Sequence, residues 1–349
     1  MRKKSTSDWA KEFLTQFMAS AAAAALVETI KATIMGGHPN YLKIRSEWIR
    51  KLAQKHGVPF KDLEKVVKRI ENSYAPWMRV AREGQKLIRP LIVKLGGSVI
   101  TDKRRKFVVK RAALRRLANE LTAAKGPLII VHGGGSFGHA VASKYGIAKG
   151  YESEQQLMGF SLTHRAMEKL NAHVIDAIQK AGLPSVAIQP SACAVVSDGR
   201  IKSMELTPVR KLLELGIVPV LYGDAIPDLS RGMSILSGDQ LAVYLARELR
   251  ASRVILGVDV DGVYTAKPKV RRGAKLVRVI TPTSWRDVVK SIGAAGGPDV
   301  TGGMANKVRE LLTLAESGIE AEIVNAAKPD ILKCAILGER GLGTTIRAG

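Results

Sequence analysis

Four short clusters in the sequence contain glycine, and each falls where a predicted strand ends or a helix begins. Glycine lets backbone N–H groups approach a phosphate closely, and the start of a helix adds a favourable dipole. The four clusters are Gly96-Gly97-Ser98, Gly133 to Gly138, Ser237-Gly238-Asp239 and Thr301-Gly302-Gly303-Met304. One such turn would be weak evidence for a ligand site. Four of them, with lysines nearby, indicate binding of phosphorylated ligands.

Two common phosphate-binding patterns do not fit this sequence. No G-x-x-x-x-G-K-[ST] segment occurs, so a P-loop is excluded. Gly133 to Gly138 matches G-x-G-x-x-G by letter, but Glu152 and Glu154, about twenty residues on, fall in a predicted loop rather than at a strand end. A nicotinamide-dependent enzyme is therefore disfavoured.

The elements that must position these clusters follow from the hydrophobic pattern after Pro90. Short apolar runs, typical of buried strands, alternate with segments of helical periodicity such as 111–124 and 154–181. The apolar runs are 91–95, 127–131, 185–189, 217–222, 253–258 and 321–325. This alternation predicts an α/β fold with a largely parallel sheet covered on both faces. Ligands of such sheets gather beyond the carboxyl ends of the strands, where the glycine clusters fall.

Residues 1–88 have a different pattern, which predicts a small all-α segment. Trp9, Phe13 and Phe17 recur at helical spacing, and Gly-containing breaks at 36–40 and 57–59 separate three predicted helices. Helix, short turn and basic helix is loosely the pattern of a helix-turn-helix, so nucleic-acid binding is a hypothesis for this segment. Most helix pairs with a glycine turn are merely packed together, and no function is assigned to the segment.

The charge of the chain predicts attraction to anions. Its 349 residues carry 55 Lys+Arg against 31 Asp+Glu, a formal net charge of +24. Residues 1–90 hold 18 of the basic and 8 of the acidic residues, so the excess is denser there. Nucleic acid, an acidic membrane surface and phosphorylated small molecules all remain possible partners on charge alone.

Composition also bounds the cellular setting. With 46% hydrophobic and 25% charged residues the chain is neither disordered nor collagen-like. Its two cysteines, Cys193 and Cys334, argue against a disulfide framework and fit a reducing compartment. The apolar run 17–27 is too short to cross about 30 Å of hydrocarbon. We therefore expect a soluble, cytoplasmic protein without a membrane span.

Five motifs in order resemble the amino-acid kinase superfamily and, within it, the archaeal-type isopentenyl phosphate kinases. They are Lys94 to Ser98, His132 to His139, Ser237 to Asp239, Asp259 to Tyr264 and Asp299 to Met304. The resemblance covers almost all of residues 89–349. It implies a three-layer αβα amino-acid-kinase-like domain with a mainly parallel central sheet, preceded by the helical extension 1–88. It also implies transfer of the γ-phosphoryl group of ATP to isopentenyl phosphate, giving isopentenyl diphosphate for isoprenoid synthesis by an alternative mevalonate route.

The resemblance assigns catalytic roles to five residues. Lysine suits phosphoryl transfer as a compact, mobile charge, because two anionic partners must be neutralised and aligned. By resemblance, Asp239 orients the lysines and His139 holds the acceptor phosphate. The five residues are Lys94, Lys103, His139, Asp239 and Lys307.

Substrate contacts are implied in the same way. The residues expected at ATP are Lys94, Gly96, Gly97, Ser98, Gly135, Asp259, Gly302 and Lys307. Those expected at the acceptor are Gly134, His139, Thr163 and Gly238. Thr163 matches a position lining the prenyl-tail pocket, where the family often has a bulkier residue, so the preferred chain length stays open. Five residues of the same helix are candidates to line an apolar slot for the tail, although core packing is favoured for most of them: Met158, Phe160, Leu162, Thr163 and Met167.

The cofactor and partner expectations complete this reading. Mg²⁺ is expected, held mainly by ATP oxygens, with no metal site built by the protein itself. A homodimer is expected. Two alternatives stay open: a kinase of the same fold acting on a phosphonate, carbamate, UMP or acyl carboxylate, and a non-catalytic anion-binding or storage protein. An intact set of Lys94, Lys103, Asp239 and Lys307 weighs against the second.

Overall fold

The computed structural model describes residues 88–265, 274–294 and 303–349, together with scattered residues between 46 and 68. The chain divides into two units, Met1–Lys86 and Leu87–Gly349. Within the first unit most of the described residues are helical, and Ile49 and Ala53 are buried. The predicted helix that contains Trp9, Phe13 and Phe17 lies outside the described residues.

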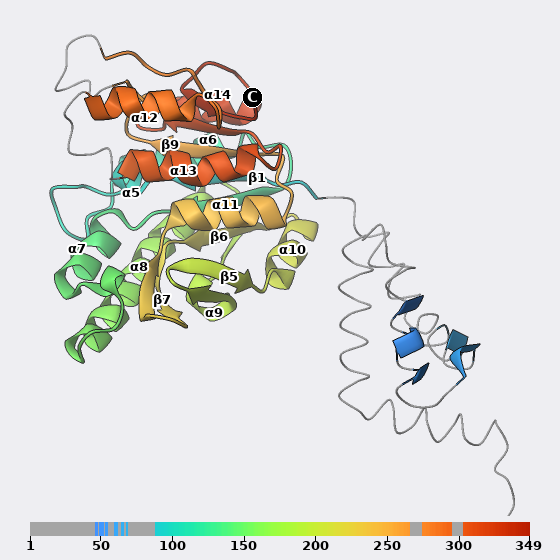
Figure 1. The fold of residues 1–349 in the computed structure, drawn as a ribbon. Helices are drawn as coiled ribbons and strands as arrows, with labels where there is room; N and C mark the ends of the chain where they lie inside the picture. The colour runs from blue at the N-terminus through green and yellow to red at the C-terminus, as the bar shows by residue number, and fades with distance from the viewer. Residues whose placement is uncertain are drawn as a thin grey trace, which may run out of the picture. The chain divides into compact units, whose positions relative to one another are not determined.

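An eight-stranded sheet forms the centre of the second unit (Figure 1). All neighbouring strands pair in parallel except β11 and β12, which are antiparallel. The order across the sheet is β10 (Val279–Ile280), β12 (Thr344–Ile346), β11 (Ala321–Asn325), β9 (Arg253–Val258), β1 (Leu91–Leu95), β2 (Leu128–His132), β6 (Val218–Tyr222) and β3 (Ser185–Ala187). The predicted mainly parallel sheet is confirmed, and each of the six predicted apolar runs supplies one of its strands.

Helices cover both faces of this sheet, which gives the three layers. Alternate residues of each central strand point to opposite faces. In β1, Ile92 belongs to one core and Val93 to the other. The first core includes residues of α10 (Thr207–Glu214), α11 (Gly238–Glu248) and α13 (Gly303–Ala315), with α12 (Trp285–Ala294) packed beside it. The second includes residues of α6 (Arg111–Leu121), α7 (Gly135–Tyr145), α8 (Gln155–Lys180) and α14 (Ile331–Leu337).

A second sheet of four strands was not predicted from the sequence. It consists of β5 (Arg200–Met204), β4 (Ala194–Ser197), β7 (Asp224–Asp228) and β8 (Gly232–Leu236), with antiparallel pairing in two hairpins. These strands are short, and several of their residues are exposed, so the buried-strand pattern that revealed the main sheet is weak here. The sheet matters for the site because β8 leads into α11 through Ser237.

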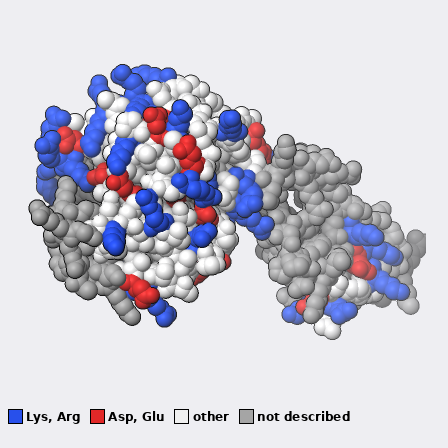
Figure 2. Space-filling model, turned by 90° about the horizontal axis from the view of Figure 1, so that it is seen from above, with Lys and Arg blue, Asp and Glu red and all other residues white. Residues whose placement is uncertain are grey.

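Short connecting helices complete the unit. They are α5 (Gly97–Ile100), the 3₁₀ turn Ile147–Lys149 and α9 (Pro190–Cys193). None of the described helices is long and apolar enough to span a membrane. On the face drawn in Figure 2, Lys and Arg are spread over the described surface and interspersed with Asp and Glu, rather than gathered into a single patch.

Candidate functional site

A cavity of about 1190 Å³ opens beyond the carboxyl ends of β1, β2 and β9. Strand ends, glycine turns and helix starts from distant parts of the sequence form its wall, because parallel strands place their carboxyl ends at one edge of the sheet. The predicted site residues found in the wall are Lys94, Gly96, Gly97, Ser98, Lys103, Gly134, Gly135, His139, Thr163, Gly238, Asp239, Asp259 and Lys307. Gly302 lies outside the described residues.

Two lysines share one aspartate in this cavity. The Nζ atom of Lys94 lies 2.7 Å from Asp239 Oδ1, and that of Lys307 lies 2.5 Å from Asp239 Oδ2. Lys94 comes from β1, Asp239 from the first turn of α11, and Lys307 from the second turn of α13. Two ammonium groups on one carboxylate leave a net positive charge in the cavity.

The electrostatics of this cluster follow from its burial. Desolvation opposes ionisation of Asp239, but the charges of Lys94 and Lys307 outweigh it and lower the pKa of the carboxyl. Lys94 is 4% exposed, and burial is the main reason that its pKa is lowered. The charge of Asp239 counteracts this shift, while that of Lys307 adds to it. Asp239 therefore holds two mutually repelling ammonium groups side by side.

Ser237 fixes the start of α11, and with it the position of Asp239. Its hydroxyl oxygen accepts a hydrogen bond from the backbone N–H of Gln240 at 3.1 Å, which is a helix N-cap. Apolar residues of α11 and α13, including Leu245 and Val308, pack in one core. This packing brings Lys307 to the aspartate.

A second lysine–aspartate pair lies at a more open part of the wall. Lys103 Nζ is 2.7 Å from Asp259 Oδ2, and the hydroxyl of Ser98 donates to Asp259 Oδ1 at 2.9 Å. Desolvation opposes ionisation of Asp259, but these contacts outweigh it and lower the pKa of the carboxyl. Lys103 is 63% exposed and can leave this partner at little cost.

The glycine turns are in backbone contact with one another. A Cβ on Gly97 would lie 2.2 Å from the backbone nitrogen of Gly135, and Gly135 has a positive φ of 48°. The hydroxyl of Thr101 donates to the Gly97 carbonyl and accepts from the backbone N–H of Ser136 at 3.0 Å. At Gly97 and Gly135 packing alone therefore requires glycine, whether or not a phosphate binds.

His139 lies on α7 and lines the cavity. Partial desolvation and then the charges of Lys307 and Lys94 lower the pKa of its imidazole, while Asp239 counteracts them. The neutral ring is therefore favoured before a ligand binds. It can still donate one N–H hydrogen bond to an anionic oxygen.

His132 has a structural environment. It is fully buried, its Nε2 lies 3.2 Å from Asn171 Oδ1, and it stacks on Tyr222. Burial lowers the pKa of its imidazole to about 4, so the ring is neutral. His132 therefore packs in the core and is not among the residues that line the cavity.

The wall on α8 differs in part from expectation. Thr163 is buried, and its hydroxyl donates to the Gly159 carbonyl of the same helix, which leaves its methyl group for a ligand. Met167 is buried and also lines the cavity. Met158 and Leu162 are 60% and 42% exposed and do not line the cavity, so of the five apolar candidates on this helix these two belong neither to the core nor to the tail slot. Helical periodicity predicts which face of α8 is apolar. It does not predict over which part of its length other elements cover that face.

Several wall residues were not found by sequence reasoning. Arg104, Lys106 and Lys144 add positive charge, and Gly223 and Asp224 line the wall beside Gly238. The run of basic residues from Lys103 to Lys106 could have indicated an anion-binding wall. Such a run more often lies on the solvent-exposed surface. Nothing in the local sequence of Asp224 indicated its position.

These features define a class of protein: an α/β phosphate-binding fold whose cavity concentrates lysine around one carboxylate. A family model for the amino acid kinase family matches residues 89–325. The chain belongs to the amino acid kinase family.

Relatives within this family share a narrower description. An isopentenyl phosphate kinase of Methanothermobacter thermautotrophicus is 46% identical over 264 residues, covering 73% of this chain and 98% of that protein. An isopentenyl phosphate kinase of Haloferax volcanii is 38% identical over 260 residues, covering 74% and 98%.

Solved structures agree with the sequence relatives. X-ray structures of isopentenyl phosphate kinase include a chain 44% identical to this one, with a TM-score of 0.65, covering 74% of this chain and 100% of that one. A substrate complex of isopentenyl phosphate kinase has 30% identity, a TM-score of 0.61 and the same coverage.

A relative with a different description is less similar in sequence. Glutamate 5-kinase of Anaeromyxobacter dehalogenans is 26% identical to this chain over 275 residues.

Proposed function

We propose that this protein is an isopentenyl phosphate kinase, which transfers the γ-phosphoryl group of ATP to the phosphate of isopentenyl phosphate. The observation that carries the proposal is the pair of ammonium groups, Lys94 and Lys307, held on Asp239 in the same cavity as His139. The relatives with this description support it, because they match nearly their whole length to the kinase unit.

The lysines reduce the electrostatic repulsion between donor and acceptor, which is the main obstacle to the reaction. Donor and acceptor are both anionic, so catalysis consists mostly of neutralising their repulsion and aligning the reacting oxygens. Lys94 and Lys307 neutralise the transferring phosphoryl group, and Lys103 moves from Asp259 to the ATP phosphates. Gly135 and Gly302 offer backbone N–H groups to ATP.

His139 binds the acceptor phosphate through an N–H hydrogen bond, together with backbone N–H groups of Gly134 and Gly238. A dianionic acceptor favours the charged imidazolium, so binding raises the pKa of His139 from its lowered value in the free site. The charge-assisted bond then strengthens as the acceptor arrives. A carboxylate acceptor carries less charge and would gain less from this residue.

The tail of the acceptor lies against α8. Thr163 presents its methyl group and Met167 a flexible apolar side chain to the cavity. A small residue at position 163 leaves room for the prenyl tail of the acceptor. Turnover of acceptors with different tail lengths would show which length fits best.

Mg²⁺ accompanies ATP in this proposal. Among the described residues, no group of three or more His, Cys, Asp or Glu side chains could hold a metal ion. Of the acidic residues in the wall, Asp239 and Asp259 are paired with lysines, and Asp224 contacts His164. These residues fit an ion that keeps water and nucleotide oxygens as its ligands and supplies further charge neutralisation.

A cytoplasmic homodimer is the proposed working state. For the segment 1–88, docking on the kinase unit, oligomerisation and recruitment to a nucleic acid or anionic lipid all stay open, and recruitment alone would leave the chemistry unaffected. A truncation beginning at Arg89 tests this: unchanged turnover and oligomeric state, with loss of salt-sensitive RNA or DNA binding, would support recruitment. Lost turnover would contradict recruitment as the only role.

The acceptor panel is the main test. ADP release is measured with isopentenyl phosphate and, separately, with a phosphonate, carbamate, UMP and an acyl carboxylate. We expect isopentenyl phosphate to give the highest kcat/KM. Faster turnover of another acceptor would assign that activity instead, and ATP binding without turnover of any acceptor would indicate an anion-binding protein.

Two variants tie the activity to the cavity. His139→Ala and Lys94→Ala should each lower kcat/KM for isopentenyl phosphate by at least about 100-fold, the usual effect of removing one transition-state donor. His173→Ala is a matched control, since His173 is exposed on α8. A parent-like rate in both site variants would show that the activity resides elsewhere.

A further inference from the structure

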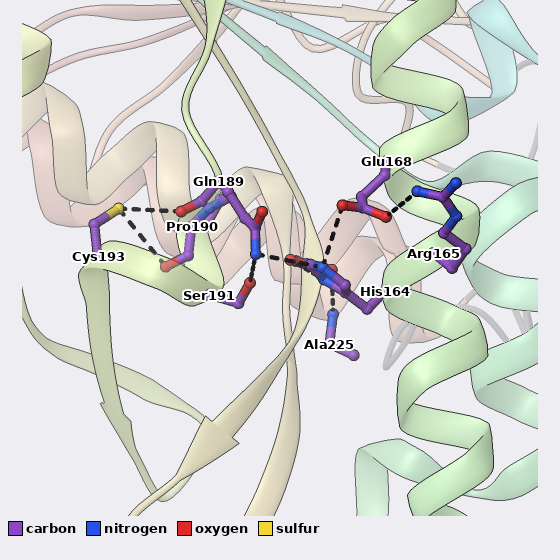
Figure 3. Close-up of polar contacts among 9 residues, drawn as sticks. His164, Arg165, Glu168, Gln189, Pro190, Ser191, Cys193 and Ala225 are labelled. Atoms are coloured by element: carbon purple, nitrogen blue, oxygen red, sulfur yellow. Dashed lines mark hydrogen bonds and ion pairs between the residues drawn. The ribbon is translucent and has the colours of Figure 1, made fainter.

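A partly buried polar cluster lies at the acceptor wall, which Asp224 helps to line. His164 follows Thr163 on α8, and its Nδ1 lies 3.0 Å and 2.9 Å from the two carboxylate oxygens of Asp224. Its other ring nitrogen, Nε2, is 3.3 Å from Gln189 Nε2 and 3.7 Å from Glu168 Oε1. Figure 3 shows His164 between Gln189 and Glu168.

Asp224 belongs to the part of the cavity wall that faces α8. It begins β7, and its side chain has no exposed surface. Its Oδ1 accepts a hydrogen bond from the backbone N–H of Ala225 at 2.9 Å. The residue before it, Gly223, packs on the start of α11: a Cβ there would lie 3.0 Å from the backbone nitrogen of Gly238.

The contact between His164 and Asp224 therefore joins two walls of the cavity. One wall is α8, which presents Thr163 to the acceptor tail. The other is the turn at Gly238, which precedes the lysine-binding Asp239. The two residues of the pair are 60 positions apart in the sequence. A contact of this kind can fix the spacing between the tail end and the phosphate end of the acceptor.

Burial limits the charge of Asp224, and its partners counteract this effect. Burial raises the pKa of Asp224 to about 6, although His164, then Ser191 and the Ala225 backbone, favour the carboxylate. The other titratable groups near the cluster are Glu168 on α8, Tyr222 on β6 and Cys193 on α9. Glu168 is paired with Arg165 at 2.9 Å. A carboxylate without His164 in this wall would both cost free energy and repel an anionic acceptor.

We propose that His164 and Asp224 are positioning residues for the acceptor, which fix α8 relative to the Gly238 turn and so set the affinity for the acceptor but not for ATP. The inference rests on the proposed function, since it concerns the acceptor side of the same cavity. Neither residue is assigned a contact with the reacting atoms.

Kinetics on the full chain test this proposal. Asp224→Asn keeps the shape of the side chain, and His164→Ala removes the link. Both should raise KM for the acceptor about tenfold and change KM for ATP and kcat less than twofold. His173→Gln, on the exposed face of α8, should behave as the parent. Equal changes in both KM values, or no change in the acceptor KM, would overturn the proposal.

A second measurement separates positioning from a merely structural role. The ratio of kcat/KM between the parent and Asp224→Asn is followed from pH 8 to pH 5. As the pH falls through about 6, the parent aspartate takes up a proton and comes to resemble asparagine, so the ratio should fall from about ten towards one. Titration of the acceptor phosphate and of His139 affects both proteins and cancels. A ratio independent of pH would overturn the proposal.

Four further outcomes can be distinguished. If His164→Ala fails to fold, Gln189→Ala, which removes the outer contact of the ring together with a hydrogen bond to Ser191, should give the same change in acceptor KM to a smaller extent. If the parent turns over another acceptor instead, the proposed function fails and the positioning proposal is judged with that acceptor. An active parent whose variants are unchanged overturns only the positioning proposal. A parent with neither turnover nor calorimetric binding of any acceptor overturns both.

Discussion

The cavity contains two lysine–aspartate clusters that differ in burial. In the buried cluster, Lys94, Asp239 and Lys307 are 4%, 14% and 22% exposed. In the exposed cluster, Lys103 and Asp259 are 63% and 35% exposed, with Ser98 as a third member. Charges interact more strongly away from water, because the effective dielectric constant is lower there. The buried cluster is therefore a fixed electrostatic device, whereas the exposed cluster can exchange its partner for a substrate phosphate.

The largest expected effect comes from removing the carboxylate of the buried cluster. Asp239→Ala leaves Lys94 and Lys307 to repel each other and to lose their alignment, so kcat should fall about 100- to 1000-fold. Asp176→Ala, at an exposed position of α8, is the control in the same turnover assay. A loss below tenfold would mean that the lysines are held in place by packing alone.

The same cluster should make stability depend on pH. The folded protein holds the pKa of Asp239 below its ordinary value, so this carboxylate contributes stability above the unfolded pKa, and the contribution is lost as the pH falls through the lower folded value. At neutral pH, Asp239→Asn should lower the free energy of unfolding by about 2 kcal/mol. The difference between the melting temperatures of parent and variant should become smaller as the pH is lowered from 7. A constant difference would contradict this cause.

The exposed cluster should respond differently. Lys103→Ala should raise KM for ATP about tenfold, with a smaller effect on kcat, and change the free energy of unfolding by less than about 1 kcal/mol because exposed ion pairs contribute little. Added salt should weaken ATP binding more in the parent than in the variant, since one screened contact is missing from the variant. Loss of stability comparable to that of Asp239→Asn would remove the distinction between the clusters.

Ser98→Ala should have the smallest effect. The hydroxyl donates one hydrogen bond to Asp259, and such bonds contribute about 1 kcal/mol at most sites. KM for ATP should rise two- to fivefold, or about 1 kcal/mol or less. A larger change would give Ser98 a direct contact with the nucleotide.

Local sequence patterns were sufficient for the main sheet but not for the small one. The strand Leu91–Leu95 was predicted with its observed bounds, because a short apolar run followed by Gly96-Gly97 is a strong local signal. By contrast, β5 is largely exposed, and its pairing with β4 depends on contacts that local periodicity does not contain. Whether such segments form strands depends more on the strands that they pack and pair with than on the β-propensity of their own residues.

The site shows the same division. Glycine at 97 and 135, lysine at 94 and 307 and aspartate at 239 were identifiable as residue types suited to phosphate chemistry. Their spacing alone did not assign a role to each residue. The resemblance to a known kinase family supplied these roles. His164 received no role, since a histidine on a helix has many ordinary environments and its partner Asp224 is distant in the sequence.

The sequence by itself determined the alternation of strands and helices and the glycine turns at the strand ends, with lysines beside them. These features depend on hydrophobic periodicity and backbone freedom, which act over a few residues. Only the tertiary structure decided that Lys94 and Lys307 share Asp239, with Lys307 and Asp239 lying 68 positions apart, and that His164 joins Asp224 at the acceptor wall. The reason is the strand order: placing β9, β1 and β2 side by side, with α11 and α13 over them, brings together charges that no local pattern connects.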